Sequence, residues 1–137
     1  MFFADVPATE LRPAYFMAHF EPEIRSGSTA VPDYWVKRPL IKHLHDVARQ
    51  QGRDGIAFVR CSVKNSGRLN DCDVTQLLGG EGFRNAALRL SRRFLLKPHI
   101  ASQAQSLSAR VTIRILMCRS ETCDPPEYRY KPGSKHP

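Results

Sequence analysis

Two cysteines on either side of a turn-like sequence form the pair of residues with the clearest chemical potential in the chain. Cys61 and Cys72 lie in the stretch FVRCSVKNSGRLNDCDV, which is typical of two strands joined by a short turn. If the turn has two central residues, Cys61 faces Cys72 and Val59 faces Val74. Directly opposed side chains can approach disulfide distance. The spacing therefore favours a bridge, and a pair of buried thiols is the alternative.

The exact pairing of the two strands depends on the turn. We expect the hairpin to close through Ser66 and Gly67. A three-residue loop with Gly67 in a bulge would shift the pairing by one position and turn Asp71 and Asp73 toward the valine face. Burying unpaired carboxylates is costly, so the sequence disfavours this shift.

Other kinds of site find little support in the sequence. Structural zinc needs four converging ligands, and nothing else lies at ligand spacing from the cysteine pair. A nucleophilic cysteine needs a base and an electropositive surrounding, whereas Cys61 lies among valines. His43 and His45 are two residues apart, so on one helix they point in different directions. The sequence predicts no catalytic residue, no metal ligand and no cofactor.

Two helices and a final strand complete the predicted core. The segment PDYWVKRPLIKHLHDVARQQG is typical of a helix that Gly52 can end, with Trp35 and Tyr34 over one end of the core. The segment GEGFRNAALRLSRRFLLKP predicts a second helix that Pro98 cannot easily continue. The segment ARVTIRILM alternates strictly, which predicts a half-buried strand. Its core-facing residues are Val111, Ile113, Ile115 and Met117.

The two ends of the chain are predicted to lie outside this domain, which spans residues 34–117. Residues 1–33 contain four prolines and predict an irregular arm with one short apolar turn at AYFMAHF. Residues 118–137 predict a mobile tail, and whether Cys118 and Cys123 pair is left open. No apolar run reaches the length of a membrane span, and no signal peptide is recognisable.

The charge of the chain suggests acidic partners. Lys and Arg number 21 against 13 Asp and Glu, which gives a net charge of +8. Such a charge makes nucleic-acid binding the alternative function. Four basic residues gather on one side of the second predicted helix, but no aromatic residues alternate with them, so a solvated basic face is the favoured interpretation. These residues are Arg89, Arg92, Arg93 and Lys97.

The order of these elements resembles the C-terminal domain of TonB, the energy transducer of Gram-negative envelopes. The resemblance runs from about Pro32 to Met117 and rests on Gly55, the hairpin Gly67, GFRNAAL, RRF and Pro98. It is greatest for the subgroup with a cysteine pair in its first hairpin. The resemblance implies an α+β fold, with a three-stranded antiparallel sheet and two helices packed on one face, and a periplasmic location.

The resemblance also implies a function and a site. In that family the domain binds an extended segment of an outer-membrane transporter, which is thought to add as a strand beside the last strand. Here the matching partner-binding residues are Arg110, Thr112, Arg114 and Leu116. A last strand with an open edge would suit strand addition to this or another envelope protein. The sequence leaves a homodimer open.

Two features depart from the family pattern. The family usually shows Tyr-Pro early in its first helix, near the position where the partner binds, and this chain has His45 and Asp46 there. A transducer also needs a membrane anchor and a proline-rich spacer. The chain is therefore expected to be either an excised domain or a free-standing relative that cannot transmit force alone. It is expected to be anchored in the inner membrane only if an N-terminal segment precedes it.

Overall fold

The computed structural model describes residues 15–24 and 34–120 and shows an α+β fold. Its main sheet has four antiparallel strands in the order β1-β6-β3-β4. These strands are β1 (Phe16–Glu21), β3 (Gly55–Val63), β4 (Leu69–Leu78) and β6 (Arg110–Met117). The sequence predicts three of these strands, so the expectation of a three-stranded sheet is wrong by one strand.

The additional strand, β1, lies within the segment that was predicted to be an irregular arm. It pairs with β6 along its whole length, from Phe16 opposite Ile115 to Glu21 opposite Arg110. Its residues alternate in exposure, with Phe20 buried against the core and Met17 exposed. The same alternation is visible in the letters FMAHFE, but prolines close to both ends obscured it.

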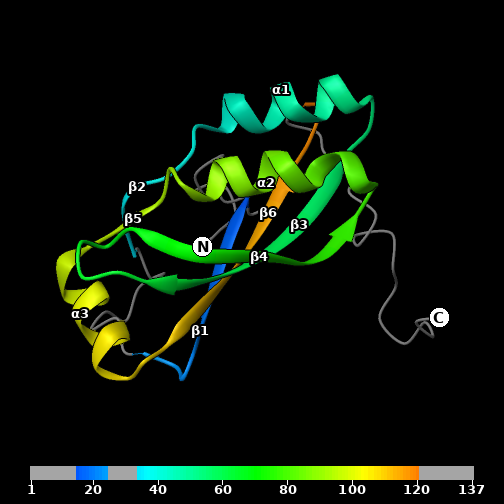
Figure 1. Cartoon of the computed structure of the whole chain (residues 1–137). Coiled ribbons are helices and arrows are strands. Elements are labelled where there is room, and N and C mark those ends of the chain that lie inside the picture. The colour runs from blue at the N-terminus through cyan, green and yellow to red at the C-terminus, as the bar shows by residue number, and fades with distance from the viewer. Residues whose placement is uncertain (1–14, 25–33, 121–137) are drawn as a thin grey trace, which may run out of the picture.

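Two helices cover one face of the main sheet (Figure 1). Helix α1 (Ile41–Gln51) packs over β6, and α2 (Arg84–Ser91) packs over β3 and β4. As predicted, α1 ends at Gly52, whose φ of 70° is left-handed. A short 3₁₀ turn, η3 (Glu81–Phe83), precedes α2. The prediction of two helices on one face is confirmed in these elements.

Two features of the second half of the chain were not expected. Helix α3 (Pro98–Ser106) lies apart from α1 and α2 (Figure 1), and Pro98 begins it rather than only ending the preceding segment. Strand β2 (Trp35–Lys37) lies where the first helix was predicted to begin, and it pairs with β5 (Leu95–Leu96). Trp35 is nevertheless buried against Phe94, as expected for a residue that covers one end of the core.

The hairpin of β3 and β4 has the pairing of a three-residue loop close to the turn and the pairing of a two-residue turn farther from it. Close to the turn, Lys64 and Arg68 are joined by a backbone hydrogen bond of 2.8 Å, so the loop has three residues and the expected two-residue turn is wrong. A bulge at Asp71, with a φ of 52°, then takes up the extra residue. Beyond this bulge Val59 faces Val74 as predicted. The bulge is the reason why the carboxylates do not turn into the core.

The core lies between the helices and the inner face of the sheet. Its largest fully buried side chains include Phe83, Phe94, Leu44, Ile113 and Ile115. The described residues contain no helix with the length and apolar character that crossing a bilayer requires. Of the tail predicted over residues 118–137, residues 121–137 lie outside the described residues, whereas Cys118 is fully buried.

Candidate functional site

The candidate site is the side of β6 that faces β1. In an antiparallel strand, alternate residues direct both backbone groups to the same neighbour. The Leu116 amide donates to the Tyr15 carbonyl oxygen at 2.9 Å, so Leu116 directs its backbone groups toward the β1 side. By alternation the same holds for the other predicted partner-binding residues, Arg110, Thr112 and Arg114. The backbone N–H and C=O groups of these four residues therefore form the edge of β6 that faces β1.

This edge is not open in the structure. Strand β1 lies along it, so β6 is an interior strand between β1 and β3. The expectation of an unpaired edge on β6 is therefore wrong. The physical reason is that an unpaired strand edge leaves N–H and C=O groups without partners, and β1 provides them. The role of the four residues in binding a partner stays a prediction.

The side chains at these positions differ in accessibility. Arg110, Thr112 and Arg114 are half-buried, whereas Leu116 is fully buried and offers only its backbone. Above this part of β6 lies a shallow hollow of about 450 Å³. It is lined by Met17, Ala18, His19, Phe58, Thr112 and Arg114.

Arg110 connects the outer strands of the sheet. It lies opposite Glu21 of β1 in the register, and its guanidinium donates to the carbonyl oxygen of Asp71 at 3.2 Å. Asp71 is the bulge residue of β4, on the other side of β3. Arg110 therefore fixes one end of β6 to the bulge that sets the hairpin register.

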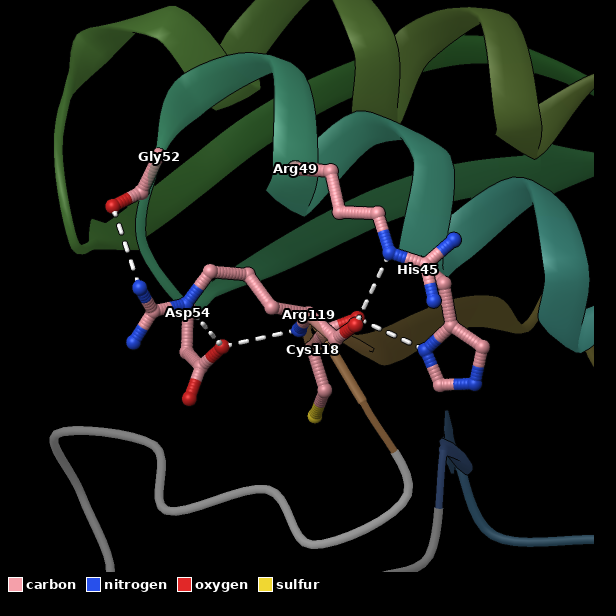
Figure 2. Close-up of polar contacts among 6 residues, drawn as sticks. All are labelled: His45, Arg49, Gly52, Asp54, Cys118 and Arg119. Carbon is pink, nitrogen blue, oxygen red and sulfur yellow. Dashed lines mark hydrogen bonds and ion pairs between the residues drawn. The ribbon is translucent and has the colours of Figure 1, made fainter.

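The opposite end of β6 is fixed to α1 by a second polar cluster (Figure 2). His45 Nδ1 lies 2.7 Å from the Cys118 carbonyl oxygen, and Arg49 donates to the Arg119 carbonyl oxygen at 3.1 Å. The backbone amide of Arg119 donates to Asp54 at 2.8 Å. His45 thus holds the chain just after β6.

The same histidine also contacts the beginning of β1. The rings of Tyr15 and His45 meet edge to face with centroids 5.9 Å apart. The histidine therefore lies at a junction of β1, β6 and α1. Its position between Leu44 and Asp46 in the sequence gave no signal of this role, because the role depends on contacts between segments that are far apart in the chain.

The predicted disulfide is present. Cys61 and Cys72 are bonded, with Cα atoms 4.1 Å apart, and Cys61 is fully buried. Cys118 is also disulfide-bonded, and Cys123 lies outside the described residues. Within the described part of the chain, no three His, Cys, Asp or Glu side chains gather in a way that could hold a metal ion.

Comparison with known proteins identifies a family. Residues 45–115, just over half of the chain, match the model of the Gram-negative bacterial TonB protein C-terminal. No curated protein and no solved structure matches the chain. The matched region contains most of α1, the disulfide-bonded hairpin, α2 and most of β6, whereas β1 lies outside it. The chain therefore belongs to the family of TonB C-terminal domains.

Proposed function

We propose that this protein is a non-enzymatic, periplasmic interaction module that binds an extended segment of an outer-membrane transporter or another envelope protein. Membership in the TonB C-terminal family supports an envelope interaction module. The disulfides are in keeping with an oxidising compartment such as the periplasm.

The pairing of β1 with β6 is the observation that carries the proposed site. It shows that this side of β6 accepts an antiparallel strand of six residues. Among the described residues no disulfide joins β1 to the rest of the sheet. A partner segment would take the place of β1, and the backbone groups of Arg110, Thr112, Arg114 and Leu116 would pair with it instead.

The side chains around this edge give the partner its expected character. Arg110 and Arg114 flank Thr112 on the same face of β6, so acidic residues are favoured at alternate positions of the partner. Strand β1, which occupies this edge, has an acidic residue at one of these positions, because Glu21 lies opposite Arg110. Reversal of one charge, as in Arg114→Glu, is expected to weaken binding of an acidic segment.

A covalent lock on β1 tests whether the partner uses this edge. His19 and Thr112 lie opposite each other as a hydrogen-bonded pair, and the Cα atoms of such pairs are about 5.5 Å apart, within the range of disulfides. The double variant His19→Cys/Thr112→Cys is therefore expected to join β1 to β6. Mass spectrometry of peptide fragments verifies that the new bridge has formed and that Cys61 is still bonded to Cys72.

Binding is measured by calorimetry with synthetic N-terminal segments of outer-membrane transporters. A segment that binds the wild type should lose its affinity for the locked variant and keep it for each single variant. If the locked variant binds as tightly as the wild type, the partner does not replace β1 and the proposed site is wrong.

A further inference from the structure

A second concave surface of the molecule has no role in the strand pairing described above. It is a hollow of about 530 Å³ between β2, the beginning of α1, the hairpin turn and the end of α2. We call it the basic groove, because five of its lining residues are cationic. They are Lys37, Arg38, Arg68, Arg92 and Arg93.

The fold brings these residues together from three separate segments. Strand β2 carries Lys37 and pairs with β5, and the Gly67 carbonyl oxygen of the hairpin turn accepts a hydrogen bond of 2.9 Å from Leu96 of β5. This contact requires a glycine, because a Cβ atom at Gly67 would lie 2.6 Å from the Leu96 carbonyl oxygen. The guanidinium of Arg68 then donates to the Arg92 carbonyl oxygen at 3.4 Å, which places both arginines on the same wall.

The positive charge of the groove is not neutralised by the described part of the protein. No carboxylate among the described residues forms an ion pair with any of the five cations. Asp46 lines an adjoining hollow that Arg93 also lines, but its carboxylate lies 3.6 Å from Arg49. Five like charges around one hollow repel one another, so an anionic ligand would lower the energy of this surface.

An ion pair lies at the other end of α2, away from the groove. Glu81 and Arg84 form an exposed ion pair there, and the pKa of Glu81 is lowered chiefly because Arg84 donates a hydrogen bond to it. Arg92 and Arg93 follow the last residue of α2. The acidic residue that enters α2 therefore pairs with a neighbour and leaves the groove cationic.

A histidine supplies an independent sign of a binding surface. His43 lines both the basic groove and the adjoining hollow. Its Nδ1 atom is buried and has no hydrogen-bond partner. Buried polar atoms in folded proteins are nearly always paired, so a ligand or a water molecule in the groove is expected to satisfy this one.

The remaining lining residues decide which class of anion fits. Val36 and Leu40 are 54% and 62% exposed at the side of the groove. Trp35 is buried, and the lining contains no Phe, Tyr or Trp on which a base could stack. A surface that alternates cations with exposed apolar side chains suits a polypeptide better than a nucleic acid.

We propose that the basic groove binds an acidic polypeptide segment of a partner protein, in which carboxylates alternate with aliphatic side chains. The carboxylates would pair with Arg68, Arg92 and Arg93, since guanidinium groups bind carboxylates in a two-pronged geometry. The aliphatic side chains would cover Val36 and Leu40. This surface shares no residue with the edge of β6, so the inference goes beyond the proposed function.

Fluorescence anisotropy with the full chain, its disulfides intact, tests this inference. The probe is a fluorescein-labelled peptide of alternating Glu and Leu, and the matched control peptide carries Gln in place of Glu. The variant Arg92→Glu/Arg93→Glu is compared with Arg53→Glu/Arg60→Glu, which changes the net charge equally at exposed positions outside the groove. Circular dichroism verifies that both variants remain folded.

We expect the groove variant to weaken binding of the Glu probe by about tenfold or more, and the control variant by less than about threefold. The Gln peptide should bind weakly to the wild type. The variant Leu40→Asn should weaken binding of the Glu probe although it leaves the net charge unchanged. An equal loss in both charge variants, or no binding of the Glu probe, would overturn the inference.

Two further arms separate this inference from its alternatives. If a single-stranded oligonucleotide binds more tightly than the Glu probe and shows the same sensitivity to Arg92→Glu/Arg93→Glu, the groove is a nucleic-acid site and the proposal is wrong. The locked variant His19→Cys/Thr112→Cys should bind the Glu probe like the wild type. A failure of the groove is therefore distinguishable from a failure of the β6 edge.

Discussion

The two flanks of the central strand pair are held in different ways. On one flank, β4 follows β3 directly in the sequence, and the two strands are joined by a three-residue loop and by the disulfide between Cys61 and Cys72. On the other flank, β1 pairs with β6 across almost a hundred residues of sequence, through backbone hydrogen bonds and the burial of a few side chains. From this comparison we predict one permanent flank, at β4, and one exchangeable flank, at β1.

The largest effect should come from removing the covalent link of the permanent flank. The double variant Cys61→Ala/Cys72→Ala is expected to lower the free energy of unfolding by about 2 to 4 kcal/mol, because the reduced chain regains conformational entropy. Urea denaturation of the variant and the wild type measures this change. Variants are preferable to a reductant, because a reductant would also break the disulfide of Cys118. A change below about 0.5 kcal/mol would show that the turn and the bulges alone secure β4.

A smaller effect on global stability is expected from damage to β1. Phe20 is buried and meets Tyr34 with ring centroids 5.2 Å apart. In an ordinary core, Phe→Ala costs about 3 to 5 kcal/mol. If β1 can detach while the rest stays folded, the measured loss for Phe20→Ala is limited to the free energy of detachment, and we expect about 1 to 2 kcal/mol. A loss of the full core value would mean that β1 unfolds only together with the sheet.

Hydrogen exchange sharpens the comparison within a single strand. Along β6, the amides of Thr112, Arg114 and Leu116 face β1, and those of Ile113 and Ile115 face β3. We expect the amides that face β1 to exchange about tenfold faster or more, which corresponds to about 1.4 kcal/mol. The rates are measured residue by residue by NMR. Equal rates along the strand would contradict an independent opening of β1.

The smallest effect should come from the exposed charges on the permanent flank. Asp73 lies opposite Arg60 in the register, and both side chains are exposed. The change Asp73→Ala is expected to alter the free energy of unfolding by less than about 0.5 kcal/mol, because exposed charges are screened by water. Thermal denaturation at low and high salt provides the measurement. A larger, salt-dependent loss would show that charge pairing as well as the disulfide holds β4.

The sequence predicts the local parts of the fold well. The apolar faces of α1 and α2 and the alternation along β6 follow from residue periodicity, which depends only on neighbours in the chain. The cysteine pairing also follows from a short hairpin. The bulge at Asp71 could not be predicted, because it compensates for the extra residue of the three-residue loop, and the expected loop had two residues.

The parts that escape prediction depend on distant segments. Strand β1 is short, and nothing in FMAHFE indicates that its partner lies at Arg110–Met117. The presence of β1 on this side of β6 was therefore not foreseen, and the partner-binding role of the edge residues stays a prediction. In the same way, the basic groove collects single residues from three segments, and only Arg92 and Arg93 stood out in the sequence as part of a cluster.

The cluster of His45, Arg49, Asp54 and Arg119 has a mechanical consequence (Figure 2). It fastens the chain just after β6 to α1 and to the segment between α1 and β3. A strand docked lengthwise on β6 and then pulled along its axis would load its row of hydrogen bonds together, in shear, rather than one after another. Traction received in this way would pass into α1 through His45 and Arg49, and into the segment that follows α1 through Asp54.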